Sequence, residues 1–373
     1  MAKNDNLGEA KKAKNDEFYT QYGDIEAEMN SYVEYDPNVF RDKVILLPCD
    51  DPEWSNFTKY FSSNFTRFGI KKLISTSYAK GASNKEITLF EMESPLFDEE
   101  KHETRGKIFT LTHDKDGSGM IDTDDIEFSG YLEGDGDFRS EEVKKLRDEA
   151  DIIITNPPFS LFREFLAWIM EAKKKFIIIG NINCLTYKEV FPLIKSNQIW
   201  TGYRFNQRVN GKNMTFRVPK DYPLAGTELY VGKDGEKYIS VAGTGWFTNI
   251  EHGKRHENLL LDTMEHNLKF NKQLKKKFEE YGCKTYPKYD NYDAIEVPFT
   301  ECIPSDYDGV MGVPITFLDK FNPEQFEILG ATESEGKGFS NGLWNGDVAQ
   351  ATINGARVYK RLFICSKKGE NAQ

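Results

Sequence analysis

The fold is decided by the stretch Asp151-Ile-Ile-Ile-Thr-Asn156-Pro157-Pro158-Phe159, an apolar run that ends in an amide, two prolines and an aromatic ring. An unbroken run of isoleucines is typical of a strand covered on both faces of a sheet. A helical pattern follows at 161–170, so the stretch predicts a strand, a turn and a helix in succession. Ligands of open α/β sheets bind beyond the carboxyl ends of strands, which is where the prolines and the aromatic ring would lie.

The same alternation of strand and helix occurs elsewhere in the chain. Apolar runs at 44–47 and 176–179 are candidate strands, and helical patterns follow them at 53–65 and 187–194. A further strand is expected at 72–78. Repeated strand–helix units predict an α/β fold, a Rossmann-like doubly wound sheet.

Two regions depart from this alternation. Short alternating runs predict hairpins inserted into the sheet, at 86–91, 107–112 and 126–132. Beyond about residue 200 the sequence changes to strands and loops rich in Gly, Asn, Tyr and Lys, interrupted by one long amphipathic helix at 262–281. We therefore expect one domain over residues 1–250 and a second, α+β region over 251–373.

The composition of the 373 residues bounds the class of protein. A net charge of −11 argues against a purely electrostatic nucleic-acid binder. No window of about 18 consecutive apolar residues occurs, so we expect no membrane span. Five cysteines without a CxxC pair argue against a disulfide framework or a zinc knuckle, and they favour a cytoplasmic location with its reducing conditions.

The charge is unevenly distributed. Residues 112–142 hold eleven acidic and two basic side chains, a balance of −9, whereas 201–220 hold five basic side chains and no acid. A basic segment that mixes Arg, Asn and aromatic residues can neutralise phosphates and read base edges, although a solvated hairpin would look the same. The candidate nucleic-acid contacts are Arg204, Arg208, Lys212, Asn213 and Arg217.

The turn after the strand at 151–155 has the chemistry of a site for a planar amine. The two prolines fix the backbone and remove two N–H donors, which leaves their carbonyls as rigid acceptors. Asn156 adds an amide oxygen, and Phe159 offers a flat apolar face. A strand-ending turn with a core phenylalanine is the structural alternative.

This turn resembles the catalytic motif of adenine-specific amino-methyltransferases that use S-adenosyl-L-methionine. In that family the Asn side chain and the first Pro carbonyl accept hydrogen bonds from the adenine amino group, while the aromatic ring stacks on the base. The target base is first flipped out of the double helix. The resemblance implies a catalytic site made of Asn156, Pro157, Pro158 and Phe159.

Three further segments resemble the cofactor-binding parts of the EcoRI-type modification methylases. Residues 15–20 are similar to an FYT motif beside the methionine end of the cofactor, and 48–52 are similar to a CDDP turn whose carboxylates can accept from a cationic amine. Residues 134–139 resemble a segment in which an Asp and a Phe bind the adenine of the cofactor. The resemblance implies a cofactor site of Phe18, Tyr19, Thr20, Cys49, Asp50, Asp51, Pro52, Asp137 and Phe138.

The resemblance to this family continues along much of the chain, at 179–183, 203–205, 213–217, 246–249 and 308–315. It implies a site-specific adenine methyltransferase that acts on double-stranded DNA, with a catalytic domain over 1–250 and target recognition by 251–373 together with 203–217. Such an enzyme works beside a restriction endonuclease for the same site or alone. An RNA adenine or a protein glutamine amide would suit the same acceptors, and both remain alternative substrates.

One segment suggests a metal site instead. Residues 114–125 fit the register of an EF-hand loop, with acidic or hydroxyl side chains at most ligand positions. The last ligand position holds Asp125 rather than the longer Glu, and both flanks alternate as strands do. We therefore expect a polar hairpin loop here and no metal centre in the protein, with incidental weak Ca2+ binding by this loop as the alternative.

Overall fold

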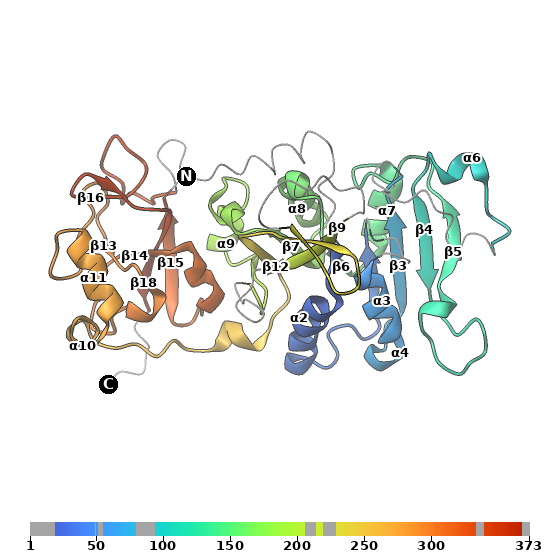
Figure 1. The fold of residues 1–373 in the computed structure, drawn as a ribbon, viewed down its shortest axis with the longest axis horizontal. Coiled ribbons are helices and arrows are strands. Elements are labelled where there is room, and N and C mark those ends of the chain that lie inside the picture. The colour runs from blue at the N-terminus through green and yellow to red at the C-terminus, as the bar shows by residue number, and fades with distance from the viewer. Residues whose placement is uncertain are drawn as a thin grey trace. The chain divides into compact units, whose positions relative to one another are not determined.

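The computed structural model describes residues 19–48, 50, 55–79, 94–205, 214–218, 229–332 and 339–367 (Figure 1). The chain divides into two compact units. Unit 1 comprises Met1–Asn181 and Arg204–His252, and unit 2 comprises Ile182–Tyr203 and Gly253–Gln373. One division falls after His252, next to the boundary expected at residue 250, but residues 182–203 group with the second unit. The roles expected of the two domains stay predictions.

Unit 1 is built on a mixed sheet. Four parallel strands lie at its centre in the order β3 (Lys72–Ser77), β2 (Val44–Leu47), β6 (Ile152–Thr155) and β7 (Lys175–Asn181). A hairpin of β4 (Lys107–Leu111) and β5 (Glu127–Tyr131) extends the sheet beyond β3, and β12 (Thr244–Thr248) extends it beyond β7. Both additions run antiparallel to their neighbours. The strands expected at 44–47, 152–154 and 176–179 and the hairpin over 107–132 are confirmed, whereas 86–91 lies outside the described residues.

Helices cover both faces of this sheet. Trp246 of β12 lies 6.0 Å, centroid to centroid, from Phe57 of α3 (Asn56–Ser63). Its neighbour Phe247 lies 5.3 Å from Phe162 of α8 (Phe162–Glu171). Because successive strand residues point to opposite faces, α3 and α8 lie on opposite sides of the sheet (Figure 1). Other helices of this unit are α2 (Tyr22–Tyr35), α4 (Phe65–Phe68), α6 (Glu99–His102) and α7 (Glu141–Glu149).

Capping residues set the bounds of the helix expected at 53–65. The Ser55 side chain accepts hydrogen bonds from two backbone N–H groups of the first turn, so α3 begins at Asn56. The helix breaks at Asn64, and the following α4 ends at Phe68, just before Gly69, whose φ of +65° suits glycine. The expected helix is therefore present but shorter, and it is divided in two.

Unit 2 contains a four-stranded sheet in the order β13 (Ile295–Glu296), β14 (Met311–Pro314), β18 (Arg361–Ser366) and β15 (Phe326–Ala331). A small hairpin pairs β16 (Thr352–Ile353) with β17 (Ala356–Arg357). Shorter elements are η3 (Ile182–Thr186), α9 (Phe191–Lys195), β8 (Trp200–Thr201), η4 (Gly253–His256), η5 (Thr300–Cys302) and η6 (Ile315–Lys320). The helix expected at 187–194 is thus reduced to the short α9.

The single helix expected at 262–281 is wrong. The structure has α10 (Met264–Phe270) and α11 (Lys272–Glu280), separated by Asn271 in an extended conformation. The Asn271 side chain accepts a hydrogen bond of 2.9 Å from the backbone N–H of Leu274 and so caps α11. The capping bond competes with continuation of the helix, which the amphipathic pattern alone does not reveal. Among the described residues, no helix is long and apolar enough to cross a bilayer.

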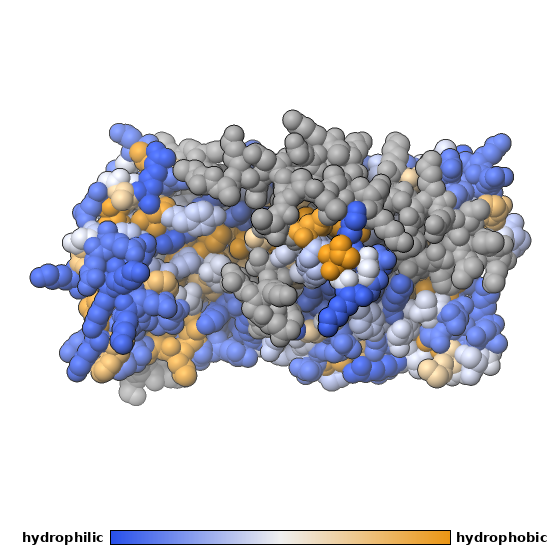
Figure 2. Space-filling model, viewed as in Figure 1, coloured by the Kyte–Doolittle hydropathy of each residue, from blue (hydrophilic) through white to orange (hydrophobic). Residues whose placement is uncertain are grey.

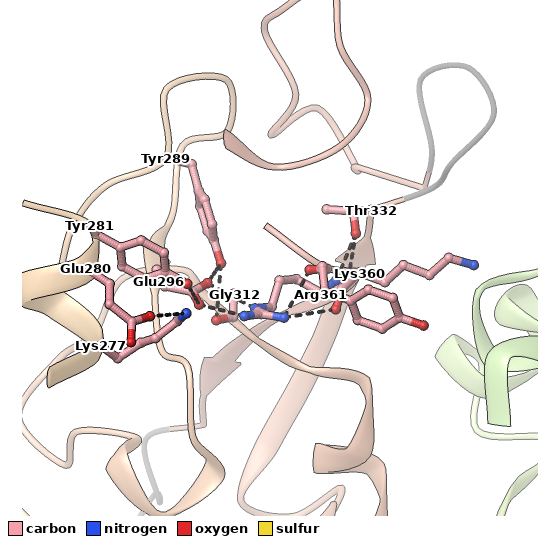
Figure 3. Close-up of polar contacts among 10 residues, drawn as sticks. Lys277, Glu280, Tyr281, Tyr289, Glu296, Gly312, Thr332, Lys360 and Arg361 are labelled. Carbon is pink, nitrogen blue, oxygen red and sulfur yellow. Dashed lines mark hydrogen bonds and ion pairs between the residues drawn. The ribbon is translucent and has the colours of Figure 1, made fainter. Parts of the chain in front are cut away.

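A buried ion pair connects strands β13 and β18 in the sheet of unit 2 (Figure 3). Arg361 of β18 bonds both carboxylate oxygens of Glu296 on β13, at 2.7 Å and 3.0 Å. Glu296 is fully buried and Arg361 is 7% exposed. Tyr289 also donates its hydroxyl hydrogen to Glu296, and burial together with the nearby carboxylate raises the pKa of Tyr289 well above its usual value. The side chains thus compensate a charge that would otherwise be costly to bury.

We expect Arg361→Met to destabilise unit 2 by about 3–5 kcal/mol, because it leaves the Glu296 carboxylate buried without its cation. Lys277→Met is the matched control, since Lys277 pairs with Glu280 at an exposed site and its loss costs at most about 1 kcal/mol. Hydrogen exchange in peptides that cover β14 and β18 measures the free energy of opening. Equal losses in the two variants would contradict this account of the pair.

Candidate active site

The predicted catalytic and cofactor segments follow two neighbouring strands. β2 and β6 are parallel and adjacent, and the chain proceeds from them in opposite directions, to β3 on one side and to β7 on the other. Asp50 follows β2 and Asn156 follows β6. A point at which the strand order reverses is the usual ligand site of an open α/β sheet. The structure therefore brings these two residues to one such edge.

Asp50 is held there by two hydroxyl groups. Thr155 Oγ1, at the end of β6, lies 2.7 Å from Asp50 Oδ2 and 2.8 Å from the Pro48 carbonyl oxygen. Ser55, the cap of α3, donates to Asp50 Oδ1 at 2.7 Å. The carboxylate is 9% exposed and joins the ends of two strands to the start of a helix. A carboxylate fixed in this way suits a cationic group.

The turn predicted to be catalytic has the expected form. β6 ends at Thr155, a single 3-10 turn, η2 (Phe159–Leu161), follows the prolines, and α8 begins directly afterwards. Asn156 is half-buried, and its Oδ1 has no contact with solvent. An acceptor shielded from water interacts more strongly with a donor than an exposed one does. The strand, turn and helix predicted from 151–170 are confirmed.

A small antiparallel sheet lies beside this turn. Its order is β1 (Tyr19–Thr20), β9 (Thr215–Val218), β11 (Lys237–Ser240) and β10 (Leu229–Val231). Phe216 of β9 pairs with Thr20, and its ring lies 6.1 Å from that of Phe159. The Thr20 carbonyl accepts a hydrogen bond of 2.7 Å from Asn56 Nδ2 at the start of α3. Residues 19–20, at the end of the segment similar to the FYT motif, are therefore neighbours of the catalytic turn. The same holds for residues 215–218 of the basic segment.

The side chains of Tyr19 and Thr20 lie on opposite faces of this small sheet. Thr20 is 3% exposed and shares its face with Phe216, toward the catalytic turn. Among the described residues, no group is placed to hydrogen bond with the buried Thr20 Oγ1. A buried hydroxyl that lacks a partner is costly, so this atom suits a polar group of a ligand. Tyr19 lies on the other face, where the Arg217 guanidinium is 5.4 Å from its ring centroid.

The predicted cofactor segment at 134–139 packs at the carboxyl end of β3. Gly136 has a φ of +88°, and a Cβ there would lie 2.4 Å from the carbonyl oxygen of Ser77, so only glycine fits. The Asp137 carboxylate accepts from the Arg139 guanidinium at 2.6 Å. Phe138 is buried, with its ring 5.1 Å from that of Phe165 on α8. Asp137 thus lies at the edge of the sheet, while Phe138 belongs to the core; their cofactor roles stay predictions.

Several predicted site residues lie outside the described residues, namely Phe18, Cys49, Asp51, Pro52, Arg208, Lys212 and Asn213. Of the predicted DNA contacts, only Arg204 and Arg217 are described. The backbone N–H of Arg204 donates to the buried carboxylate of Glu28 at 2.7 Å. The DNA-binding roles of all five stay predictions.

The acidic loop over 114–125 has strands on both sides, as expected for a hairpin. Ligand oxygens of Asp114, Asp116 and Asp125 lie within 4.8 Å of one another. They accept hydrogen bonds from the loop's own backbone, for example from Gly117 N to Asp114 at 2.7 Å and from Lys115 N to Asp125 at 2.7 Å. Asp125 also ends the short η1 (Thr123–Asp125), and the carboxylates stabilise the loop.

Sequence reasoning missed the residues that support the site. Thr155 and Ser55 hold Asp50, and Phe216 packs against Phe159. A hydroxyl that ends an otherwise apolar strand, and a serine just before a helix, are signals that would have found the first two. Phe216 lies next to Arg217 in the basic segment, which is a weaker signal.

Comparison with known proteins agrees with this geometry. A model of the family described as "Adenine-specific methyltransferase EcoRI" matches residues 6–367. The Type II methyltransferase M.EcoRI of Escherichia coli is 44% identical over 368 residues, which cover 98% of each chain. The Type II methyltransferase M.MgeORF184P of Mycoplasma genitalium is 33% identical over 364 residues, 95% of this chain and 96% of the relative.

A third relative, the Type II methyltransferase M.MpnI of Mycoplasma pneumoniae, is 35% identical over 322 residues, 86% of this chain and 83% of the relative. No solved structure matches the chain. The family model and these alignments extend over nearly the whole sequence, including the catalytic turn and the three predicted cofactor segments. The chain therefore belongs to the EcoRI-type family of adenine-specific DNA methyltransferases.

Proposed function

We propose that the chain transfers the methyl group of S-adenosyl-L-methionine to the N6 amino group of an adenine flipped out of double-stranded DNA. The observation that carries the proposal is that Asn156 and Phe159 follow β6 at the point where the strand order reverses, and that Phe216 connects Phe159 to Thr20. Parallel strands with helices on both faces support a Rossmann-like methyltransferase sheet.

The groups around Asp50 fit this cofactor. The fixed Asp50 carboxylate suits a cationic amine, and the buried Thr20 Oγ1 suits a polar group at the same end of the ligand. Asp137, at the end of β3, suits an amino group farther along the edge. When bound, S-adenosylmethionine supplies a methyl group on a positively charged sulfur.

Asn156 and Pro157 act on the target base. The Asn156 side-chain oxygen and the Pro157 carbonyl accept the two hydrogens of the adenine amino group, which keeps electron density on its nitrogen. The proton leaves to water after transfer, so no strong general base is required. Stacking on Phe159 returns about 1–3 kcal/mol, against the few kcal/mol that flipping costs.

We propose that residues 251–373, together with residues 203–217, recognise the DNA. The basic segment supplies five positive charges, and its described end, Arg217, follows the Phe216 that packs on the catalytic turn. The relatives carry the name Type II methyltransferase, and we propose that this enzyme likewise protects a short site that a restriction endonuclease cleaves. Four described cysteines are free thiols, which supports a location in the cytoplasm.

We expect Asn156→Ala to lower the rate of methyl transfer at least about 10²-fold, the scale for loss of one preorganised polar contact at a reacting centre. The affinity for S-adenosylmethionine should stay nearly unchanged, because Asn156 bonds the base. Transfer of labelled methyl groups to unmethylated genomic DNA measures the rate. Activity within a few-fold of the parent would remove Asn156 from its proposed role.

Thr20→Val tests the cofactor site separately. The substitution keeps the shape of the side chain and removes a hydroxyl that has no partner among the described residues. We expect the cofactor-free protein to be as stable as the parent, or more so, whereas cofactor binding weakens by about 1–3 kcal/mol. Thermal unfolding and titration calorimetry measure the two quantities. Unchanged affinity would take Thr20 out of the site.

A further inference from the structure

One register row of the small sheet carries three tyrosines and an arginine. Strand pairing places Tyr19 opposite Arg217, Arg217 opposite Tyr238, and Tyr238 opposite Tyr230. Because facing residues of paired strands point to the same side, these four side chains form a row across one face. We call this row the tyrosine row.

The other face of the same sheet belongs to the core of unit 1. Phe216 is fully buried; its cross-strand neighbour Ile239 and the partner of Ile239, Leu229, pack against the same core cluster. Strand β9 thus presents Phe216 to Phe159 of the catalytic turn and presents the next residue, Arg217, to the tyrosine row. The row therefore lies on the back of the strand that supports the catalytic turn.

The tyrosine row is partly open to solvent, because Tyr230 is exposed while its other members are half-buried. The rings of Tyr230 and Tyr238 are stacked, with centroids 5.5 Å apart and planes 22° apart. Tyr238 donates to Asp234 at 2.5 Å, a bond that raises its pKa to about 12 and keeps the ring neutral. Tyr230 is 47% exposed and its neighbour Val231 is 61% exposed, on the edge strand β10. In Figure 2 a small apolar patch with hydrophilic residues beside it lies near the centre of the view, where Figure 1 draws the yellow strands of residues 229–240.

Internal stabilisation accounts poorly for this arrangement. A stacked pair contributes most when it is buried, and an exposed apolar edge strand invites unwanted pairing. A flat aromatic pair beside a guanidinium is instead the chemistry that recognises nucleic-acid strands: bases stack on the rings, and the cation neutralises a phosphate. The enzyme acts on DNA, and flipping an adenine exposes the faces of bases that had been stacked on it.

We propose that the tyrosine row binds an unstacked stretch of the DNA strand, with Tyr230 stacking on a base and Arg217 contacting a phosphate. The inference rests on the proposed flipping of the target adenine. Tyr238 orients Tyr230 by stacking, and Tyr19 positions Arg217 by its contact with the guanidinium.

The test is the binding of a short fluorescein-labelled oligothymidylate, measured by anisotropy at several salt concentrations with the full chain. We expect Tyr230→Ala to weaken binding about tenfold, because stacking contributes strongly for each base, and to leave the salt slope unchanged. Tyr230→Phe keeps the ring and should bind within about twofold of the parent. Arg217→Gln should flatten the salt slope by about 0.7, the value for one phosphate contact on a single strand.

Tyr35→Ala is the matched control, since Tyr35 is 46% exposed in the same unit but lies at the end of α2. Tyr230→Leu keeps an apolar side chain without a flat ring and guards against misfolding of the alanine variant. Unchanged affinity in both Tyr230 variants, an equal loss in Tyr35→Ala, or a parent that does not bind the oligothymidylate would each overturn the inference. Methylation of genomic DNA by the parent tests the proposed function independently of this result.

Discussion

The hydrogen bond from Thr155 Oγ1 to the Asp50 carboxylate is the contact on which the site depends. It joins the ends of β6 and β2, the two central strands from which the chain diverges, and Ser55 continues the same network into α3. Because the carboxylate is buried, it needs these donors to stay in place. Asn156 is the residue after Thr155, so the same bond positions the catalytic turn relative to the predicted cofactor site. In the proposed function, cofactor binding and base binding are thereby coupled through one short segment.

The two-residue period of the strands divides the roles of β1 and β9. Thr20 and Phe216 face the catalytic turn, while Tyr19 and Arg217 face outward. A shift of register by one residue would exchange these faces, so the pairing itself is a functional constraint. In the proposed function, these two strands connect the cofactor site, the catalytic turn and a surface that binds DNA.

The parts of the fold that were predictable are those governed by local pattern. The runs at 44–47, 152–154 and 176–179 are β-branched or aliphatic at every position, and all three form central strands. The prediction of one continuous helix at 262–281 was wrong because the capping bond of Asn271 begins a new helix within the amphipathic pattern. The grouping of 182–203 with unit 2 and the burial of Phe138 against α8 depend on contacts between distant segments, which no local pattern encodes. The turn after β6 was predictable because two successive prolines fix their own backbone and restrict that of Asn156 before them.

The most direct test of the account is to incubate the protein with labelled S-adenosylmethionine and genomic DNA that lacks methylation, and then to sequence the DNA for modified bases. A fold that fixes two acceptors beside an aromatic ring predicts N6-methyladenine and no other modified base. The modification should fall on one adenine within one short recurring sequence. Methyl groups on cytosine, on protein, or on adenines without a common sequence would contradict the account, as would an absence of transfer.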